Sequence, residues 1–238
     1  MVDGHVTDRD TTPRDTRISV PIIQFAATDG TQLEGRLTLP DAPNGGVAVV
    51  CHPHPLHGGS MQTWMPPVLQ RALVSDGWVG LRFNFRGVGR SHGSYGGGID
   101  ERADVEGAVR RVLDEVDDPT APVLLGGWSF GANVSLAVAM RDAWISGWFG
   151  VGLPPGGEHD GLVPRLSPDE LAGWTRPKLF IHGQRDDVAP IEHARAFYDA
   201  APEPKRFHVV SGGDHYMAAH ADELADTVRD FGREVLAG

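Results

Sequence analysis

One short stretch of the chain has the residue types and spacing of a serine nucleophile. Residues 127–131 read Gly-Trp-Ser-Phe-Gly, which places Ser129 in the Gly-x-Ser-x-Gly form of a nucleophile elbow. An apolar run at 121–125 precedes it and a helix-like run at 132–141 follows. A strand-to-helix turn of this kind exposes a strained serine, and glycines flank it because a β-carbon there would meet neighbouring backbone. The pattern predicts that Ser129 is a nucleophile next to the positive end of a helix.

A serine nucleophile needs a base, and the base needs an acid to orient it. His215 follows a predicted strand at 206–210, and Asp186 and Asp187 follow a predicted strand at 178–182. Side chains just beyond parallel strands meet at one edge of the sheet. Serine, then a carboxylate, then histidine is also the chain order that accompanies this elbow. The residues therefore predict a triad of Ser129, His215 and either Asp186 or Asp187.

The elements that must position these groups alternate between strand and helix patterns. Such alternation predicts βαβ units and a mostly parallel sheet, with an antiparallel hairpin at its start that turns at residues 28–30. A serine, proline and acidic run at 167–170 predicts a short helix inside the one long connection, 152–176. The predicted strands are 18–26, 32–39, 47–52, 78–85, 123–128, 145–151, 178–182 and 206–210, and the predicted helices are 64–75, 101–116 (with Asp100 as N-cap), 130–142, 191–201 and 218–236.

Length and composition favour a single enzyme-sized domain. The chain of 238 residues is predicted to hold a leader at 1–17 that is disordered and one domain at 18–238. Its net charge of −11 argues against nucleic acid and against anionic membranes as partners. Neither a signal peptide nor an apolar run of membrane-spanning length is found, and Cys51 has no second cysteine to pair with. We therefore expect a cytoplasmic location, whereas the sequence leaves the oligomeric state open.

The motifs together resemble those of α/β-hydrolases from about Ile22 to the C-terminus. The likeness is carried by 127–131, by His-Pro-His-Pro-Leu-His-Gly-Gly at 52–59 and by Asn-Phe-Arg-Gly-Val-Gly-Arg-Ser at 84–91. A bacterial branch of small hydrolases has these motifs and resembles dienelactone hydrolases in size, although those enzymes have cysteine where this chain has Ser129. The resemblance implies an α/β-hydrolase fold with an eight-stranded sheet, helices on both faces and no large lid domain. Its pattern places the acid three residues after Gly183, at Asp186.

The resemblance also implies where an oxyanion would bind. In this fold one N–H comes from the residue after the nucleophile, Phe130, and one from the loop after the 47–52 strand. Proline has no N–H, which leaves His54 or Leu56, and alignment with the family favours His54. The histidines at 52, 54 and 57 have a spacing that could bind metal, but two prolines stiffen the segment and no carboxylate is close in sequence. We therefore expect neither a metal nor a cofactor.

These residues predict a carboxylesterase-type serine hydrolase that acts on a small-molecule ester. Leu56, Trp128 and Tyr216 are adjacent in sequence to the predicted site and are candidates for the substrate pocket. The same triad would serve an acyl thioesterase or a peptidase or amidase, and the sequence does not separate them. A binding protein on a hydrolase scaffold is the alternative from another class, although such proteins usually lose a triad residue and this chain has candidates for all three.

Overall fold

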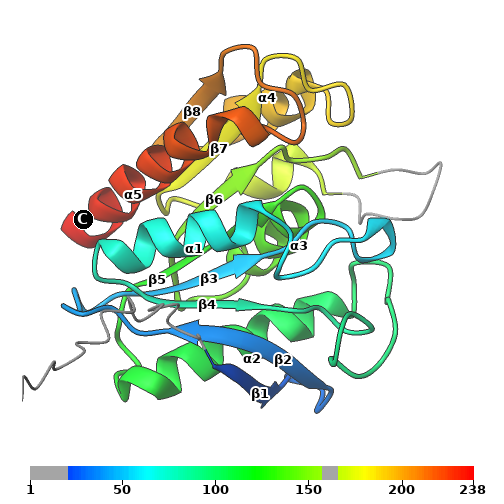
Figure 1. Cartoon of the computed structure of the whole chain (residues 1–238). Coiled ribbons are helices and arrows are strands. Elements are labelled where there is room, and N and C mark those ends of the chain that lie inside the picture. The colour runs from blue at the N-terminus through cyan, green and yellow to red at the C-terminus, as the bar shows by residue number, and fades with distance from the viewer. Residues whose placement is uncertain (1–20, 157–165) are drawn as a thin grey trace, which may run out of the picture.

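A single twisted sheet of eight strands forms the centre of the molecule (Figure 1). The computed structural model describes residues 21–156 and 166–238. The sheet order is β1-β2-β4-β3-β5-β6-β7-β8, with β1–β2 and β2–β4 antiparallel and the other neighbours parallel. The strands are β1 Ile22–Ala26, β2 Gln32–Thr38, β3 Val47–Cys51, β4 Val79–Phe83, β5 Val123–Trp128, β6 Ile145–Val151, β7 Lys178–Gly183 and β8 Lys205–Val210.

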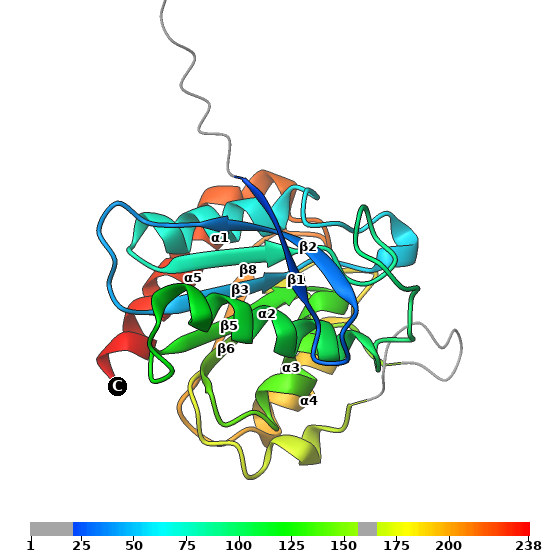
Figure 2. The same cartoon turned by 90° about the horizontal axis from the view of Figure 1, so that it is seen from below.

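Helices cover both faces of this sheet (Figure 2). Helices α2, α3 and α4 pack on one face, and α1 and α5 pack together on the other. The helices are α1 Met65–Ser75, α2 Glu101–Val116, α3 Phe130–Ala139, α4 Ile191–Ala200 and α5 Ala221–Ala237, with 3₁₀ turns at Pro55–His57, Pro168–Leu171 and Ala218–His220. Among the residues that the structure describes, no helix has both the length and the apolar character needed to cross a lipid bilayer.

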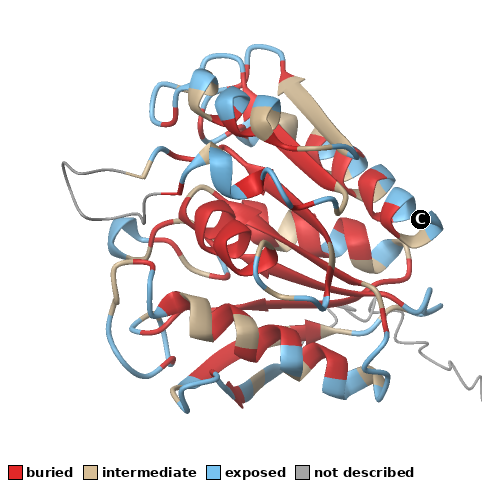
Figure 3. Ribbon diagram, turned by 180° about the vertical axis from the view of Figure 1, so that it is seen from behind, coloured by how far each residue is buried: buried red, intermediate tan, exposed pale blue. Residues whose placement is uncertain are grey.

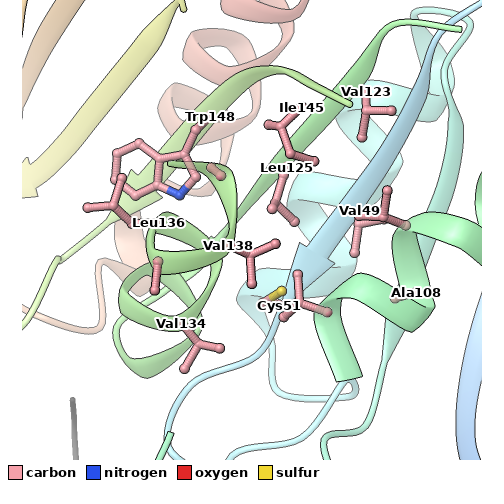
Figure 4. Close-up of a cluster of buried hydrophobic side chains, with 14 of the residues drawn as sticks. Val49, Cys51, Ala108, Val123, Leu125, Val134, Leu136, Val138, Ile145 and Trp148 are labelled. Atoms are coloured by element: carbon pink, nitrogen blue, oxygen red, sulfur yellow. The ribbon is translucent and has the colours of Figure 1, made fainter. Parts of the chain in front are cut away.

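Successive side chains of the central strands point to opposite faces of the sheet, and they form two separate hydrophobic cores. Val49 and Leu125 point into the cluster on the α2–α3 side, whereas Val50 and Leu124 point into the cluster on the α1–α5 side. Figure 4 shows the first cluster, where Trp148 and apolar side chains of α3 close over the strands. All ten residues of α3 are buried, which explains why its sequence is mostly apolar and has no exposed polar face. Figure 3 shows the same pattern, with the central strands buried and the outer helices exposed on one side.

The predicted fold class is therefore confirmed, and the differences lie mainly at element ends. The helix after Ser129 stops at Ala139 instead of continuing to 142, and the last α-helix begins at Ala221 after a 3₁₀ turn. The short helix predicted at 167–170 is the 3₁₀ turn Pro168–Leu171, and Ser167 caps it through a capping box. The predicted leader 1–17 and the first residues of the 18–26 strand lie outside the described residues.

Asp100 occupies the predicted N-cap position of α2, but its side chain does not cap the helix. Asp100 has helical backbone angles, and its side chain makes no capping hydrogen bond to α2. The neighbouring Glu101 is fully buried and turns back instead, where it accepts the N–H groups of Gly96 and Gly98 at 2.7 Å each. The first acidic side chain of α2 therefore fixes the glycine-rich loop before the helix. The hydrophobic pattern of the helix does not predict this contact.

Candidate active site

Ser129 lies in a strained turn between β5 and α3. Its φ and ψ are 55° and −118°, and its N–H donates to Val151 O at 2.8 Å. The flanking glycines allow this turn, because a β-carbon at Gly127 would lie 2.8 Å from Cys51 O and one at Gly131 would lie 2.5 Å from the same oxygen. Such contacts are closer than real β-carbons make. The elbow therefore packs its backbone directly against the end of β3.

The three residues predicted as a triad are connected by hydrogen bonds. His215 Nε2 lies 3.0 Å from Ser129 Oγ, and His215 Nδ1 lies 2.8 Å from Asp186 Oδ2. The carboxylate accepts a hydrogen bond from the Nδ1–H of His215, which leaves Nε2 as the acceptor for the serine hydroxyl. The three side chains follow β5, β7 and β8, at the same edge of the sheet. This is the arrangement that converts a serine hydroxyl into a nucleophile.

The Asp186 carboxylate is buried and remains ionised. Its second oxygen, Oδ1, accepts the N–H groups of Val188 at 3.1 Å and Ala189 at 2.7 Å. Burial by itself would raise the pKa of Asp186, but the hydrogen bonds from His215 and from Ala189 N–H hold that pKa below its usual range. Its neighbour Asp187 is exposed. Of the two carboxylates that the residues alone left open, Asp186 is the one hydrogen-bonded to the imidazole.

Two further residues shape this part of the site, and neither was predicted from the sequence as a site residue. Gly152 has a φ of 57°, and a β-carbon there would lie 3.2 Å from His215 Cε1 and 3.4 Å from Asp186 Oδ2. It follows β6 directly, which is the signal that could have drawn attention to it. His182 is fully buried, and its Nε2 donates to Ala189 O at 2.6 Å and lies 3.4 Å from Asp186 Oδ2. Burial lowers the pKa of His182, so a neutral ring closes the loop that holds the acid.

The histidines at the end of β3 have separate tasks. His52 Nδ1 donates to Pro53 O at 2.6 Å and its Nε2 accepts Phe85 N–H at 3.1 Å, and burial lowers its pKa to about 4. His54 Nδ1 accepts the N–H of Leu56 at 3.1 Å. Its ring stacks on that of His57 at 4.5 Å between centroids. Over residues 21–156 and 166–238, no three His, Cys, Asp or Glu side chains gather as a metal-binding group.

The segment 84–98 carries structural hydrogen bonds. The guanidinium of Arg86 donates to Asp104 at 2.7 Å and to Asp29 at 2.8 Å, and its backbone N–H donates to Asp104 at 2.9 Å. These bonds tie the turn between β1 and β2 to helix α2. Arg86 therefore has a structural role in this network.

The predicted substrate-binding residues differ in exposure. Leu56 is 60% exposed and Tyr216 is 58% exposed, so both present apolar surface to solvent. The ring of Tyr216 lies 5.8 Å from that of His215. Trp128 is only 3% exposed, and its indole N–H donates to His215 O at 3.1 Å. Leu56 and Tyr216 can therefore face a ligand, whereas Trp128 faces mainly the protein.

Comparisons with known proteins agree with this fold. The model of the alpha/beta hydrolase domain family matches residues 48–229, so the chain belongs to that family, and its class is that of a hydrolase. It is 31% identical to an alpha-beta serine hydrolase homologue from Coxiella burnetii, with a TM-score of 0.77 over 88% of this chain and 96% of that one.

Two further relatives are similar over most of their length. A serine hydrolase without a lid from Xanthomonas campestris is 25% identical, with a TM-score of 0.75 over 90% of this chain and 94% of that one. An uncharacterised protein of Rickettsia prowazekii is 27% identical over 89% of this chain and 88% of its own length. The likeness therefore spans most of the fold, and not the elbow alone.

Proposed function

We propose that this protein is a serine hydrolase of the carboxylesterase type, with Ser129 as nucleophile, His215 as base and Asp186 as acid. The observation that carries the proposal is the continuous chain of hydrogen bonds through His215, 3.0 Å to Ser129 Oγ and 2.8 Å to Asp186 Oδ2. The two bonds define the tautomer that a general base requires. The family membership and the serine hydrolase relatives support the same assignment.

The reaction proceeds in two halves. Ser129 Oγ attacks the ester carbonyl while His215 Nε2 takes the hydroxyl proton and then gives it to the departing alcohol. The ionised Asp186 stabilises the imidazolium that forms between these two transfers. Water then enters, gives its proton to His215 and cleaves the acyl-enzyme, which releases the acid and restores the Ser129 hydroxyl. Every proton in this cycle moves through His215.

The oxyanion of each tetrahedral intermediate would be held by the backbone N–H groups of Phe130 and His54. Phe130 is the first residue of α3, and the first N–H groups of a helix have no partner within the helix. The segment with His54 lies beside it, with the two rings 4.9 Å apart. Leu56, the other residue considered for this role, donates its N–H to His54 Nδ1. That bond favours His54 as the donor.

Small carboxylic esters are the substrates that fit these surroundings best. The exposed side chains of Leu56 and Tyr216 offer apolar contact to a short acyl or alcohol group, and the Tyr216 ring lies 5.8 Å from that of His215. Acyl thioesters and amides would pass through the same intermediates. They differ in the leaving group, and parallel assays with ester, thioester and anilide substrates of one acyl group distinguish them.

A serine variant with a matched control tests the proposal. Ser129→Ala is expected to lower kcat for p-nitrophenyl acetate by about 10⁶-fold and to abolish labelling by a fluorophosphonate. Ser135→Ala, on the same helix, removes a buried hydroxyl that accepts the indole N–H of Trp148, and it should retain both properties. Turnover by Ser129→Ala near that of the wild type would reject the mechanism, and a wild type with neither turnover nor labelling would indicate a binding protein.

A further inference from the structure

Trp128 ends β5 and directly precedes Ser129, yet its side chain contacts the loop that carries His215, beyond β8. The indole Nε1–H donates to the backbone carbonyl of His215 at 3.1 Å, across 87 residues of sequence. The ring is 3% exposed and belongs to the core on the α1–α5 side of the sheet. An indole N–H buried to this degree is costly to leave without an acceptor, so the bond to His215 O fixes both partners.

The His215 loop needs such a bond on the nucleophile side. On the other side, Arg185 N–H donates to Gly213 O at 2.8 Å, and Gly212 N–H donates to the side chain of Gln184 at 3.0 Å. Within the loop, Asp214 Oδ1 accepts the N–H groups of Tyr216 and Met217. These bonds hold the loop to the end of β7, where the acid lies, but they set no distance to β5.

The hydrogen bond from Trp128 to His215 O supplies the restraint between β5 and the His215 loop. It joins the residue before the nucleophile to the backbone of the base, so that β5 and the His215 loop move together. The indole and imidazole rings are also neighbours, with 5.9 Å between centroids, and Gly152 leaves room on another side of the imidazole. The imidazole of His215 therefore lies between the Trp128 ring of β5 and Gly152, which follows β6, while the Trp128 indole also binds the His215 backbone.

We propose that Trp128 is a positioning residue that holds His215 at proton-transfer distance from Ser129 through the bond between its indole N–H and the His215 carbonyl. This inference rests on the proposed function of Ser129 and His215. It gives Trp128 a different task from that of an acyl-pocket wall, because a wall acts on substrate affinity whereas a positioning residue acts on the chemical step. A displacement of the order of 1 Å in a reacting group can cost about 10²-fold in rate.

The two tasks predict different kinetics for Trp128→Phe, which keeps an aromatic ring and removes the N–H. A positioning role predicts that kcat falls by about tenfold or more, equally for p-nitrophenyl acetate, propionate and butyrate, while KM stays within about twofold. Labelling of Ser129 by a fluorophosphonate should slow in parallel, because that reaction also needs the base. A pocket wall predicts instead a change in KM that depends on the length of the acyl chain.

Trp148→Phe is the matched control. Trp148 is fully buried on the adjacent strand β6, and its indole N–H donates to Ser135 Oγ at 2.9 Å. Both variants lose one buried indole hydrogen bond, so both should lower Tm by similar amounts, but only Trp128→Phe should lower kcat. Trp128→Met, which has no donor and whose flexible apolar side chain fills irregular space, serves as a second variant if the phenylalanine variant does not fold. Its kcat is expected to fall by about tenfold or more, as for Trp128→Phe.

The outcomes separate cleanly. A folded Trp128→Phe or Trp128→Met enzyme with unchanged kcat, or with the same loss as Trp148→Phe, overturns the inference and leaves the proposed function intact. A change confined to KM also overturns it, in favour of the pocket wall. A wild-type protein that neither hydrolyses esters nor reacts with a fluorophosphonate overturns the proposed function and this inference with it.

Discussion

Replacing Asp186 by asparagine should damage catalysis far more than the same change one residue later. Both carboxylate oxygens of Asp186 are occupied by donors: Oδ2 accepts from His215, and Oδ1 accepts the N–H groups of Val188 and Ala189. An asparagine has one acceptor oxygen in place of two. If that oxygen keeps the two backbone N–H groups, the amide NH₂ faces His215 Nδ1 and favours the tautomer with its proton on Nε2. That tautomer cannot accept the proton of Ser129.

The expected magnitude follows from this change of tautomer. Loss of the orienting carboxylate costs roughly 10⁴-fold in kcat, or about 5.5 kcal/mol of transition-state stabilisation. The assay is kcat for p-nitrophenyl acetate at neutral pH, with Tm measured on each variant because the replaced group is buried. Asp187→Asn alters an exposed carboxylate next in sequence and should stay within about twofold of the wild type. The reasoning is refuted if Asp187→Asn is the inactive variant, or if both variants keep wild-type kcat.

Two further predictions concern the substrate and the dependence of stability on pH. The described part of the connection between β6 and β7 contains only the 3₁₀ turn Pro168–Leu171, so we expect a shallow pocket and kcat/KM values for p-nitrophenyl esters that do not rise from acetate to laurate; a steady rise would show that many methylenes, each worth about 0.8 kcal/mol, are buried. Burial lowers the pKa of His52 from 6.5 to about 4. Between these two pH values the unfolded chain protonates His52 more readily than the folded protein does, so the free energy of unfolding decreases as the pH falls from about 6.5 to 4. The difference in unfolding free energy between the wild type and His52→Asn, measured by urea denaturation, should therefore shrink by about 3 kcal/mol between neutral pH and pH 4, and a constant difference would contradict the burial argument.

Much of the fold could be predicted because its elements are bounded by clear changes of pattern. The strand Val123–Trp128, the strand Ile145–Val151 and the helix Glu101–Val116 have the predicted ends. Pro122 precedes the first strand and Gly152 follows the second, and both residue types mark the ends of regular elements. The predicted helix after Ser129 runs to 142, beyond the observed end of α3 at Ala139. Its last turn is decided by tertiary packing, and a helix buried on every side has no polar stripe to mark where it ends.

In the candidate site too, some residues could be predicted from the sequence and others could not. Ser129, Asp186 and His215 could be proposed from sequence because each follows a recognisable strand, and strand ends converge by topology. The contacts of Gly152, His182 and Trp128 could not, because they depend on which atoms meet across the sheet. Gly152 is conspicuous only once the His215 ring is beside it, and the Trp128 bond joins residues whose separation in sequence carries no pattern.

The end of β3 explains how a strained nucleophile and a candidate oxyanion site come to lie together. A non-glycine residue at positive φ, such as Ser129, costs of the order of 1–3 kcal/mol and persists only where its surroundings fix it. Here α3 approaches so closely that a β-carbon at Gly131 would lie 2.5 Å from Cys51 O and 2.6 Å from His52 O. The chain that leaves those two carbonyls continues to His54. The close approach that glycine permits therefore brings the start of α3, with Phe130, against the segment that carries His54, so that one packing contact serves both the elbow and the proposed oxyanion donors.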